Sequence, residues 1–593
     1  MSQKFENLWN LALETTEEIR EKTNELNVGF FPEVQEWEVI VKYHGNIQFL
    51  EERGIAVEEL IGGYAILRVP EGQVEDLAAV EEIEYVEKPK RYFFEEQLPG
   101  ENSCVYPVTL NEPGLSGEGI LMAILDSGID YEREEFRKED GSTRIRYLWD
   151  QSLDGEMGQN PPTGFRTGVE FSEEVINKAL ELGGEEGFRI VSSRDISGHG
   201  TAVAGIAAAG PVSTENGGIF QGIAPKSELL IVKLGIPREN GFPKTTEVMR
   251  AVAYAVRKGV ELKMPLVINL SFGNSYGSHD GGSLVERFLD NAAEIGRTVI
   301  CVGAGNEGDS AGHYGGDAKE TQVVEFTVGE YERSIGLQLW KQYNDEFEIR
   351  LQSPDNVEVL IENQINAGKQ VIYFRGTQAL LYWGEPKPYS VLQEIYFDLI
   401  PLGERKYIDS GIWKLKLKPI RVVNGKYDCY LPAGEARSNR TNFLRATPEM
   451  TLTIPSTASK IVTVGAYNAP LEQYAEFSGR GLAQISRENS ITIAGMIKPD
   501  LVAPGVQIVA PDVRGTYGVV TGTSFATPIV SGSAALLMEW GIVKGNDRYL
   551  YGEKVKAYLR RGAQPLRGEE RYPNERVGFG KLCVQSSIPY ISL

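Results

Sequence analysis

Short apolar runs alternate with helical stretches through the middle of the chain. Runs such as ILMAIL (120–125) and LVINLS (266–271) are almost continuously apolar, and TEVMRAVAYAVRKG (246–259) has helical spacing. Strands that are buried on both faces have this composition, because helices cover both sides of a parallel sheet. The pattern therefore predicts an α/β core. It resumes at KIVTVGAYN (460–468) after a long interruption.

The interruption has a different pattern. From about residue 321 to about residue 431, strand-like segments recur at intervals of roughly 8–15 residues with no helical stretch between them. Evenly spaced strands separated by turn residues indicate an antiparallel β-sandwich of the jelly-roll kind. The sequence thus predicts a β domain inserted into the α/β domain.

The N-terminal part predicts a third unit. Residues 1–25 are expected to form a surface helix with a polar, acidic face. Strands and short helices are then expected to alternate over 37–44, 46–54, 62–70 and 74–83, with a last extended segment at 84–94. Two strand–helix–strand units in so short a stretch indicate a small α+β sandwich of the split βαβ kind. The predicted division is an N-terminal unit (1–97), an α/β domain in two parts (98–320 and 436–593) and the β insertion (321–435).

Composition excludes several functions. The chain has 593 residues and a formal net charge of −23, which repels phosphate backbones and anionic lipid, so neither nucleic acid nor a membrane is an expected partner. The first residues lack the apolar core of a secretory signal, and no apolar run approaches the ~20 residues that span a bilayer. Synthesis in the cytoplasm is therefore expected. Widely spaced cysteines predict neither a disulfide framework nor a zinc site; they are Cys104, Cys301, Cys429 and Cys583.

Three motifs carry candidate chemistry, in the order Asp, His, Ser. Asp126 ends an apolar strand in AILDSGID, His199 begins a helix in SGHGTAVAGIAAA, and Ser524 opens a long apolar helix in GTSFATPIVSGSAALLMEW. A serine hydroxyl becomes a nucleophile when an imidazole takes its proton, and a carboxylate holds that imidazole in the right tautomer. Any one of these residues alone would more often be structural. Together they predict a catalytic triad.

A fourth residue completes the predicted machinery. Asn306 ends a buried strand among glycines in CVGAGNEGD, where its amide could donate to the oxyanion of a tetrahedral intermediate. Ser524 at a helix N-terminus also gains from the unpaired backbone amides there.

These motifs, with INLSFG (268–273), resemble those of the subtilase family of serine endopeptidases and stand in the family's order. The resemblance covers most of 104–320 and 440–585. It implies a subtilisin-like α/β fold and a protein substrate. It further implies an edge that pairs with the substrate strand, Ser271, Phe272 and Gly273, and a pocket wall for the residue before the scissile bond, Gly303, Ala304 and Gly305.

Residues 33–97 resemble a subtilase propeptide, which implies that the N-terminal unit assists folding and then inhibits the active site. Self-cleavage is expected within 94–103, near Gln97. No cofactor is expected, although Glu135 falls where the family often places an acidic calcium ligand; the loop at 211–221 does not match the family's calcium loop closely.

The combination of a jelly-roll-like insertion with a long Asp-to-His segment and no signal sequence is similar to clostridial germination proteases. That likeness implies packaging in the spore and activation of a cortex-degrading hydrolase precursor. Two alternatives stay open at this point. One is a catalytically silent signalling or binding protein on a subtilase scaffold, and the other is a general cytoplasmic peptidase.

Overall fold

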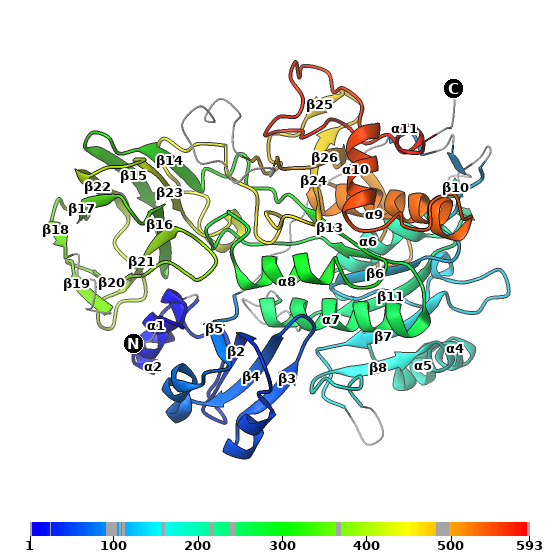
Figure 1. The fold of residues 1–593 in the computed structure, drawn as a ribbon, viewed down its shortest axis with the longest axis horizontal. Coiled ribbons are helices and arrows are strands. Elements are labelled where there is room, and N and C mark those ends of the chain that lie inside the picture. Colours follow the sequence, from blue (N-terminus) through cyan, green and yellow to red (C-terminus); the bar gives the residue numbers. More distant parts are fainter. Residues whose placement is uncertain are drawn as a thin grey trace.

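A central mixed sheet organises the molecule (Figure 1). The computed structural model describes residues 3–23, 25–90, 103–105, 108–109, 113–155, 160–213, 219–235, 243–362, 369–481 and 497–589. The strands lie in the order β25-β24-β13-β12-β6-β11-β7-β8, with β26 beside β24. Their bounds are β6 Leu121–Asp126, β7 Ile145–Asp150, β8 Val169–Ser172, β11 Glu228–Lys233, β12 Leu266–Leu270, β13 Thr298–Gly303, β24 Val462–Asn468, β25 Gln473–Tyr474 and β26 Leu501–Pro504. Every pair from β7 to β26 is parallel, and the outer strands β8 and β25 pair antiparallel.

Helices cover both faces of this sheet (Figure 1). The described helices of this part are α4 Glu173–Leu182, α5 Gly184–Ile190, α6 His199–Ala208, α7 Thr245–Leu262, α8 Leu284–Ala292, α9 Thr523–Met538, α10 Glu553–Gly562 and α11 Val584–Ser587. Successive residues of β6 face opposite cores. Met122 and Ile124 pack with α6 and α9, whereas Leu121 and Leu125 pack with α7 and α8. The predicted α/β fold is confirmed.

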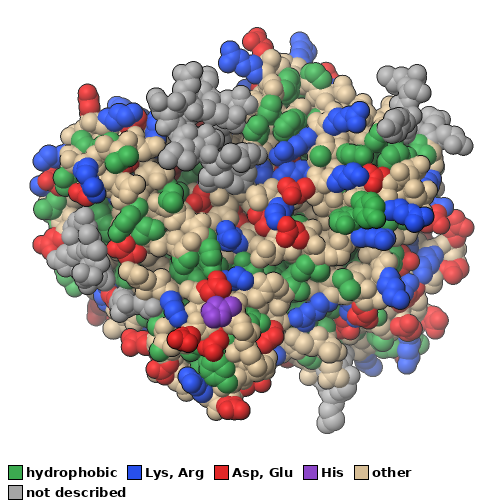
Figure 2. All heavy atoms as spheres, in the orientation of Figure 1, with side chains coloured by type: hydrophobic (Ala, Val, Ile, Leu, Met, Phe, Trp, Pro, Cys, Tyr) green, Lys and Arg blue, Asp and Glu red, His purple; other side chains and the backbone are tan. Residues whose placement is uncertain are grey.

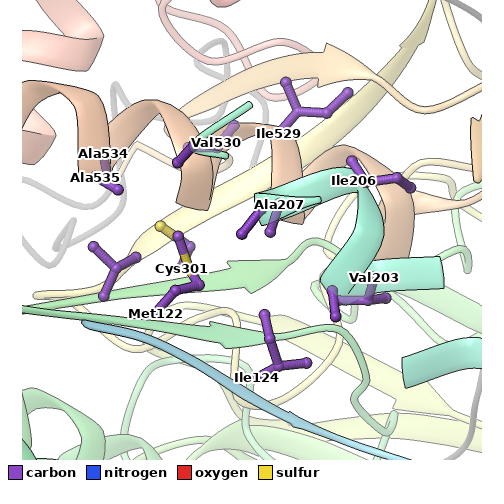
Figure 3. Packing of buried hydrophobic residues seen from close by; sticks show 14 of the residues in the cluster. Met122, Ile124, Val203, Ile206, Ala207, Cys301, Ile529, Val530, Ala534 and Ala535 are labelled. Atoms are coloured by element: carbon purple, nitrogen blue, oxygen red, sulfur yellow. The ribbon is translucent and has the colours of Figure 1, made fainter. Parts of the chain in front are cut away.

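The core between α6 and α9 fixes the two helices that begin at His199 and Ser524. Figure 3 shows Val203 and Ala207 of α6, Val530 of α9 and Met122 of the sheet, which belong to one buried cluster. All four side chains are completely buried. Because such interiors are close-packed, the starts of the two helices are held in a fixed relation.

Helix α9 and the π-helical turn that follows it, Glu539–Val543, are also long and apolar enough to cross a bilayer. However, 83% of the apolar window is buried inside the protein. Among the described residues it is the one helix that meets this criterion, and its burial is that of a core helix.

Two antiparallel sheets form the predicted β insertion, seen in green and yellow-green at the left of Figure 1. The six-stranded sheet has the order β14-β23-β16-β21-β20-β19 and the four-stranded sheet the order β15-β22-β17-β18. Their bounds are β14 His313–Asp317, β15 Gln322–Val328, β16 Ile335–Gln342, β17 Glu346–Gln352, β18 Glu358–Ile361, β19 Lys369–Tyr373, β20 Thr377–Trp383, β21 Leu392–Pro401, β22 Gly411–Arg421 and β23 Lys426–Tyr430. Alternate residues of both sheets meet in one core that includes Trp413 and Phe397. Two small hairpins lie elsewhere, β9 Val212–Ser213 with β10 Ile219–Phe220, and β27 Ile508–Pro511 with β28 Tyr517–Val520.

The N-terminal unit is a five-stranded antiparallel sheet that packs beside α7 and α8 (Figure 1). Its strands are β1 Phe30–Phe31, β2 Glu36–Tyr43, β3 Ala56–Glu59, β4 Tyr64–Pro70 and β5 Ile83–Glu87. The predicted helices are short 3₁₀ segments, Gln48–Arg53, Glu71–Gln73 and Glu75–Ala79, and β3 was not predicted from the sequence. Four residues of β3 are too few to establish an alternating pattern.

The prediction of a single surface helix over residues 1–25 is wrong. The segment forms α1 Asn7–Leu13 and α2 Glu17–Arg20, and α1 is almost entirely buried against the β insertion. The Asn7 amide donates to Glu394 of β21 at 3.1 Å, so a polar side chain is satisfied inside the protein. A partner 387 residues away cannot be recognised from local periodicity.

A buried ion-pair network joins the N-terminal unit to α7. The Arg250 guanidinium lies 2.5 Å from Glu38 of β2 and 3.1 Å from Glu58 of β3, and Thr246 donates to Glu38 at 2.7 Å. Burial alone would raise the pKa of Glu38, but Arg250 and Lys244 hold it below its ordinary value. Removing one partner of such a buried network is strongly destabilising, because the other charge is left uncompensated.

Asp398 of β21, where the β insertion meets the N-terminal unit, makes the stability of the folded protein depend on pH. Burial, and then the carboxylate of Glu25, raise the pKa of Asp398 to about 8. Between the ordinary carboxyl pKa near 4 and this value, the folded chain binds a proton that the unfolded chain does not. Stability therefore falls as pH rises through this window.

We expect Asp398→Asn to raise the Tm at pH 8 and the gain in Tm to shrink towards pH 5, as measured by thermal unfolding at both pH values. A gain of the same size at both pH values would contradict this assignment.

Surface charge is mixed on the face drawn in Figure 2, where acidic and basic side chains lie next to one another over most of the area. Exposed pairs such as Lys414–Glu325, at 2.7 Å, and Arg405–Asp409, at 2.8 Å, are examples from the β insertion. Each contributes less than ~1 kcal/mol. On this face the acidic side chains do not form a single acidic patch.

Candidate active site

Three parallel strands bring the first site residues to one edge of the sheet. Leu125, Leu270 and Val302 are aligned neighbours in β6, β12 and β13. The residues that follow them therefore lie side by side at the carboxyl ends of the strands, which is where open α/β sheets bind their ligands. Those residues are Asp126, Ser271 and Gly303.

His199 is bound to Asp126. Its Nδ1 lies 2.7 Å from Oδ1 of Asp126, which also accepts from the Ser127 amide at 2.7 Å. Asp126 is fully buried, and His199 is 5% exposed with its ring 5.2 Å from that of Phe525. A carboxylate on Nδ1 selects the tautomer in which Nε2 is free of its proton and can act as a base.

Asp195 organises the turn that leads into His199, and the sequence did not single it out. Its Oδ1 accepts from the Ser127 hydroxyl (2.8 Å) and the Gly198 amide (2.9 Å), and its Oδ2 accepts from the amide (2.8 Å) and the hydroxyl (2.7 Å) of Thr201. One carboxylate thus ties the residue after Asp126 to the first turn of α6. Gly198 reaches this turn with a φ of +79°, a conformation that glycine adopts without strain.

Asp195→Asn is expected to lower kcat by about 10–100-fold, because an amide in place of one oxygen repels N–H donors and shifts the imidazole, and misplacement by about 1 Å costs up to ~10² in rate. The measurement is steady-state hydrolysis of a peptide substrate. Asp345→Asn is the matched control, since Asp345 is likewise buried and accepts from the backbone amides of Asn424 and Gly425, at 3.0 and 2.8 Å, within the β insertion. Equal losses of kcat in both variants would contradict a specific role for Asp195.

Ser524 lies in the first turn of α9, whose core side packs against α6. Its Oγ donates to the carbonyl of Ser271 at 2.7 Å, and the Ser271 hydroxyl donates back to the Ser524 carbonyl at 2.9 Å. Asn269 supports the pair by donating to the Ser271 hydroxyl at 2.8 Å. The serine must give up its bond to Ser271 before its oxygen can attack a substrate.

Asn306 follows β13 and faces the residue before Ser524. Its Oδ1 accepts from the Thr523 amide at 3.0 Å and from the Thr523 hydroxyl at 3.2 Å. The same hydroxyl accepts from the Gly305 amide at 3.1 Å. Because Thr523 donates to the Oδ1 of Asn306, the NH₂ group at the other end of this amide is directed away from Thr523. An oxyanion donor uses that NH₂ group.

The predicted substrate edge and pocket wall lie on either side of a residue that the sequence did not indicate. Thr453 lies between Gly273 and Gly305, and its hydroxyl oxygen would be 2.5 Å from a Cβ placed on either glycine. The Thr453 amide donates to the carbonyl of Ala304 at 3.0 Å. Phe272 is buried at 4% exposure. The roles of Ser271 to Gly273 and of Gly303 to Gly305 in substrate binding stay predictions.

Two further predictions concern calcium and processing. Both oxygens of Glu135 lie within hydrogen-bond distance of the Arg133 guanidinium, and Tyr517 donates to one of them at 2.5 Å. A carboxylate neutralised by arginine does not suit a cation, and within the described ranges no three His, Cys, Asp or Glu side chains form a group that could hold a metal ion. Gln97 lies outside the described residues, as does part of the loop at 211–221.

The fold and these contacts are typical of one class of protein, the serine hydrolases that carry Asp, His, Ser and Asn side chains at the carboxyl edge of a parallel sheet. Comparison with known sequences agrees. Residues 117–383 and 436–580 match the subtilase family, and residues 3–90 match the Csp protease B prodomain. The chain belongs to the subtilase family.

Individual relatives show which subtilases this chain is similar to. The structure of the Clostridium perfringens CspB protease is 34% identical and superposes with a TM-score of 0.72, covering 82% of this chain and 95% of that one. The minor extracellular protease Vpr of Bacillus subtilis is 25% identical over 511 residues, 81% of this chain and 52% of Vpr. The C5a peptidase of Streptococcus pyogenes is 24% identical and matches 73% of this chain and 36% of its own length. The chain thus spans about half or less of these two curated relatives.

Proposed function

We propose that this chain is a self-processing serine endopeptidase that cleaves a precursor protein during spore germination. The observation that carries the proposal is the 2.7 Å bond between His199 and Asp126 beside a serine at a helix N-terminus. The prodomain match and the similarity to the CspB protease support the germination branch of the family. Packaging in the spore after synthesis in the cytoplasm is part of the same proposal.

Peptide cleavage would begin with a proton transfer. His199 takes the proton of Ser524 as Oγ leaves the Ser271 carbonyl and attacks the scissile carbonyl carbon. Asp126 stabilises the imidazolium that forms. The negative oxygen of the tetrahedral intermediate accepts from the Asn306 amide and from the backbone amide of Ser524 at the helix start. His199 then returns the proton to the leaving amine, and an acyl-enzyme on Ser524 remains for water to hydrolyse.

The N-terminal unit would act as the intramolecular inhibitor in this scheme. It is fixed to α7 by Glu38, Glu58 and Arg250, and the chain runs from Lys90 towards the expected processing segment 94–103. The Lys90 amide donates to the Thr245 hydroxyl at the start of α7 at 2.9 Å. The end of the described N-terminal unit is thereby docked to the catalytic part.

The substrate of the proposed enzyme is a folded precursor, a cortex-lytic hydrolase zymogen. The test is to incubate the purified chain with such a clostridial precursor and, separately, with unfolded casein, and to follow both by mass spectrometry. One discrete cut in the precursor and little digestion of casein supports limited activation. Broad digestion of casein with no discrete cut in the precursor would instead show a general peptidase.

Catalytic competence is tested separately with a fluorescent fluorophosphonate. The wild-type chain should be labelled on the peptide that contains Ser524, and His199→Ala should not be labelled. A wild-type chain that stays unlabelled would point to a silent subtilase.

A further inference from the structure

We propose that His279 is a positioning residue that holds the predicted substrate edge against the segment that contains Thr453. This role rests on the proposed peptidase function. His279 lies in the connection between β12 and α8, six residues after Gly273, and touches neither the triad nor Asn306 in any described contact.

The histidine ring lies between two backbone carbonyls, one from each of these segments. Its Nδ1 lies 2.7 Å from the carbonyl of Leu452, the residue before Thr453, and its Nε2 lies 3.1 Å from the carbonyl of Ser275, two residues after Gly273. Between them the backbone of Asn274 pairs with that of Ile454 at 2.8 and 3.0 Å. Because His279 belongs to the segment that follows Gly273, its contact with Leu452 joins the same two segments as this backbone bridge and restrains their separation at a second point.

The β insertion holds the ring in place. His279 stacks on Tyr430 of β23 with ring centroids 4.0 Å apart and an interplanar angle of 12°. The Tyr430 hydroxyl donates to the carbonyl of Met450 at 3.2 Å, which fixes the tyrosine to the segment that leads to Leu452. A φ of +49° at His279 turns the backbone so that the side chain reaches this position. Histidine and asparagine tolerate that conformation better than most residues.

The ring is neutral near pH 7. Burial, together with nearby His313 of β14, lowers the pKa of His279 to about 4, although the Ser275 and Leu452 carbonyls and the carboxylate of Asp428 act to raise it. A neutral imidazole has one N–H, and the shorter contact assigns it to Nδ1, which donates to Leu452. An asparagine amide at position 279 could supply the same donor.

His313 offers a matched control. It is a buried histidine that also stacks on Tyr430, with centroids 4.6 Å apart. Its nitrogens contact Asp428 and Thr447, at 3.0 and 3.2 Å, within and beside the β insertion, and have no described contact with Leu452 or Ser275. His313→Ala should disturb the same stack without releasing Leu452.

The experiment measures kcat and KM on a peptide that extends four residues before the scissile bond, together with the labelling rate by a small fluorophosphonate. His279→Ala is expected to raise KM about tenfold with kcat and labelling within about twofold of wild type, the effect of losing one buried donor to a binding segment. His279→Asn should restore most of the KM. His313→Ala should lower the Tm while KM stays within about twofold of wild type.

Several outcomes would overturn the proposal. An unchanged KM in His279→Ala, an equal rise in His313→Ala, or equal losses of labelling and peptide turnover would each show a role in stability alone. Failure of the asparagine variant to recover KM would show that the Leu452 bond is not what matters. If the wild-type chain itself does not react with the phosphonate, the proposed function fails, and this role fails with it.

Discussion

Ser524→Ala is expected to reduce peptide hydrolysis by about 10⁶-fold, the loss that follows removal of the nucleophile from a Ser-His-Asp triad. The rest of the site would remain, because the alanine removes one hydroxyl whose described partner is the Ser271 carbonyl at 2.7 Å. We therefore expect a Tm within ~2 °C of wild type, which corresponds to no more than about 1 kcal/mol. The measurement is hydrolysis of a chromogenic peptide together with thermal unfolding.

Ser533→Ala is the matched control for this variant. Ser533 lies in the same helix, is fully buried and donates to the Ile529 carbonyl at 2.7 Å. Its substitution removes an equivalent buried hydroxyl away from the site, so activity should stay within about twofold of wild type. If Ser524→Ala kept more than about 1% of wild-type activity, Ser524 would not be the nucleophile.

Asn306→Ala should lower kcat by about 10²–10³-fold and leave KM nearly unchanged, because an oxyanion donor acts on the transition state and not on the bound substrate. Hydrolysis of the same peptide over a range of concentrations separates the two constants. An increase in KM with an unchanged kcat would contradict the oxyanion role.

Asn306→Asp separates the oxyanion role from support of Thr523. Aspartate has the same shape and keeps an oxygen to accept from the Thr523 amide, a bond of 3.0 Å in the wild type. It replaces the NH₂ donor by a negative oxygen, however, so kcat should fall at least as far as in the alanine variant while the Tm is retained. An aspartate variant with near wild-type kcat would show that Asn306 acts only by holding Thr523.

Much of the α/β core could be predicted because its signals are local. Strand β6 is apolar at every position up to Asp126, and both of its faces are buried, so composition alone identifies it. Asp126, His199, Ser524 and Asn306 each lie within a short motif of characteristic residues. The structure joins His199 to Asp126, and Asn306 to the residue before Ser524.

The residues that were missed depend on contacts between distant segments. Asp195 is one acidic residue in a polar turn, and only the fold shows that it binds Ser127, 68 positions earlier in the chain. Thr453 gives no signal in the sequence, because its place between Gly273 and Gly305 depends on where the chain returns after the β insertion. A surface helix is predicted over residues 1–25 because nothing near Asn7 in the sequence indicates its bond to Glu394.

The most direct test of the central claim is the intact mass of the wild-type chain and of Ser524→Ala, both purified from the same cytoplasmic expression host. If the chain is a self-processing serine peptidase, the wild type will be cut once within residues 94–103, near Gln97, and the variant will remain whole. The same cleavage state in the two chains, whether both are cut at the same position or both stay uncut, would contradict self-processing by Ser524.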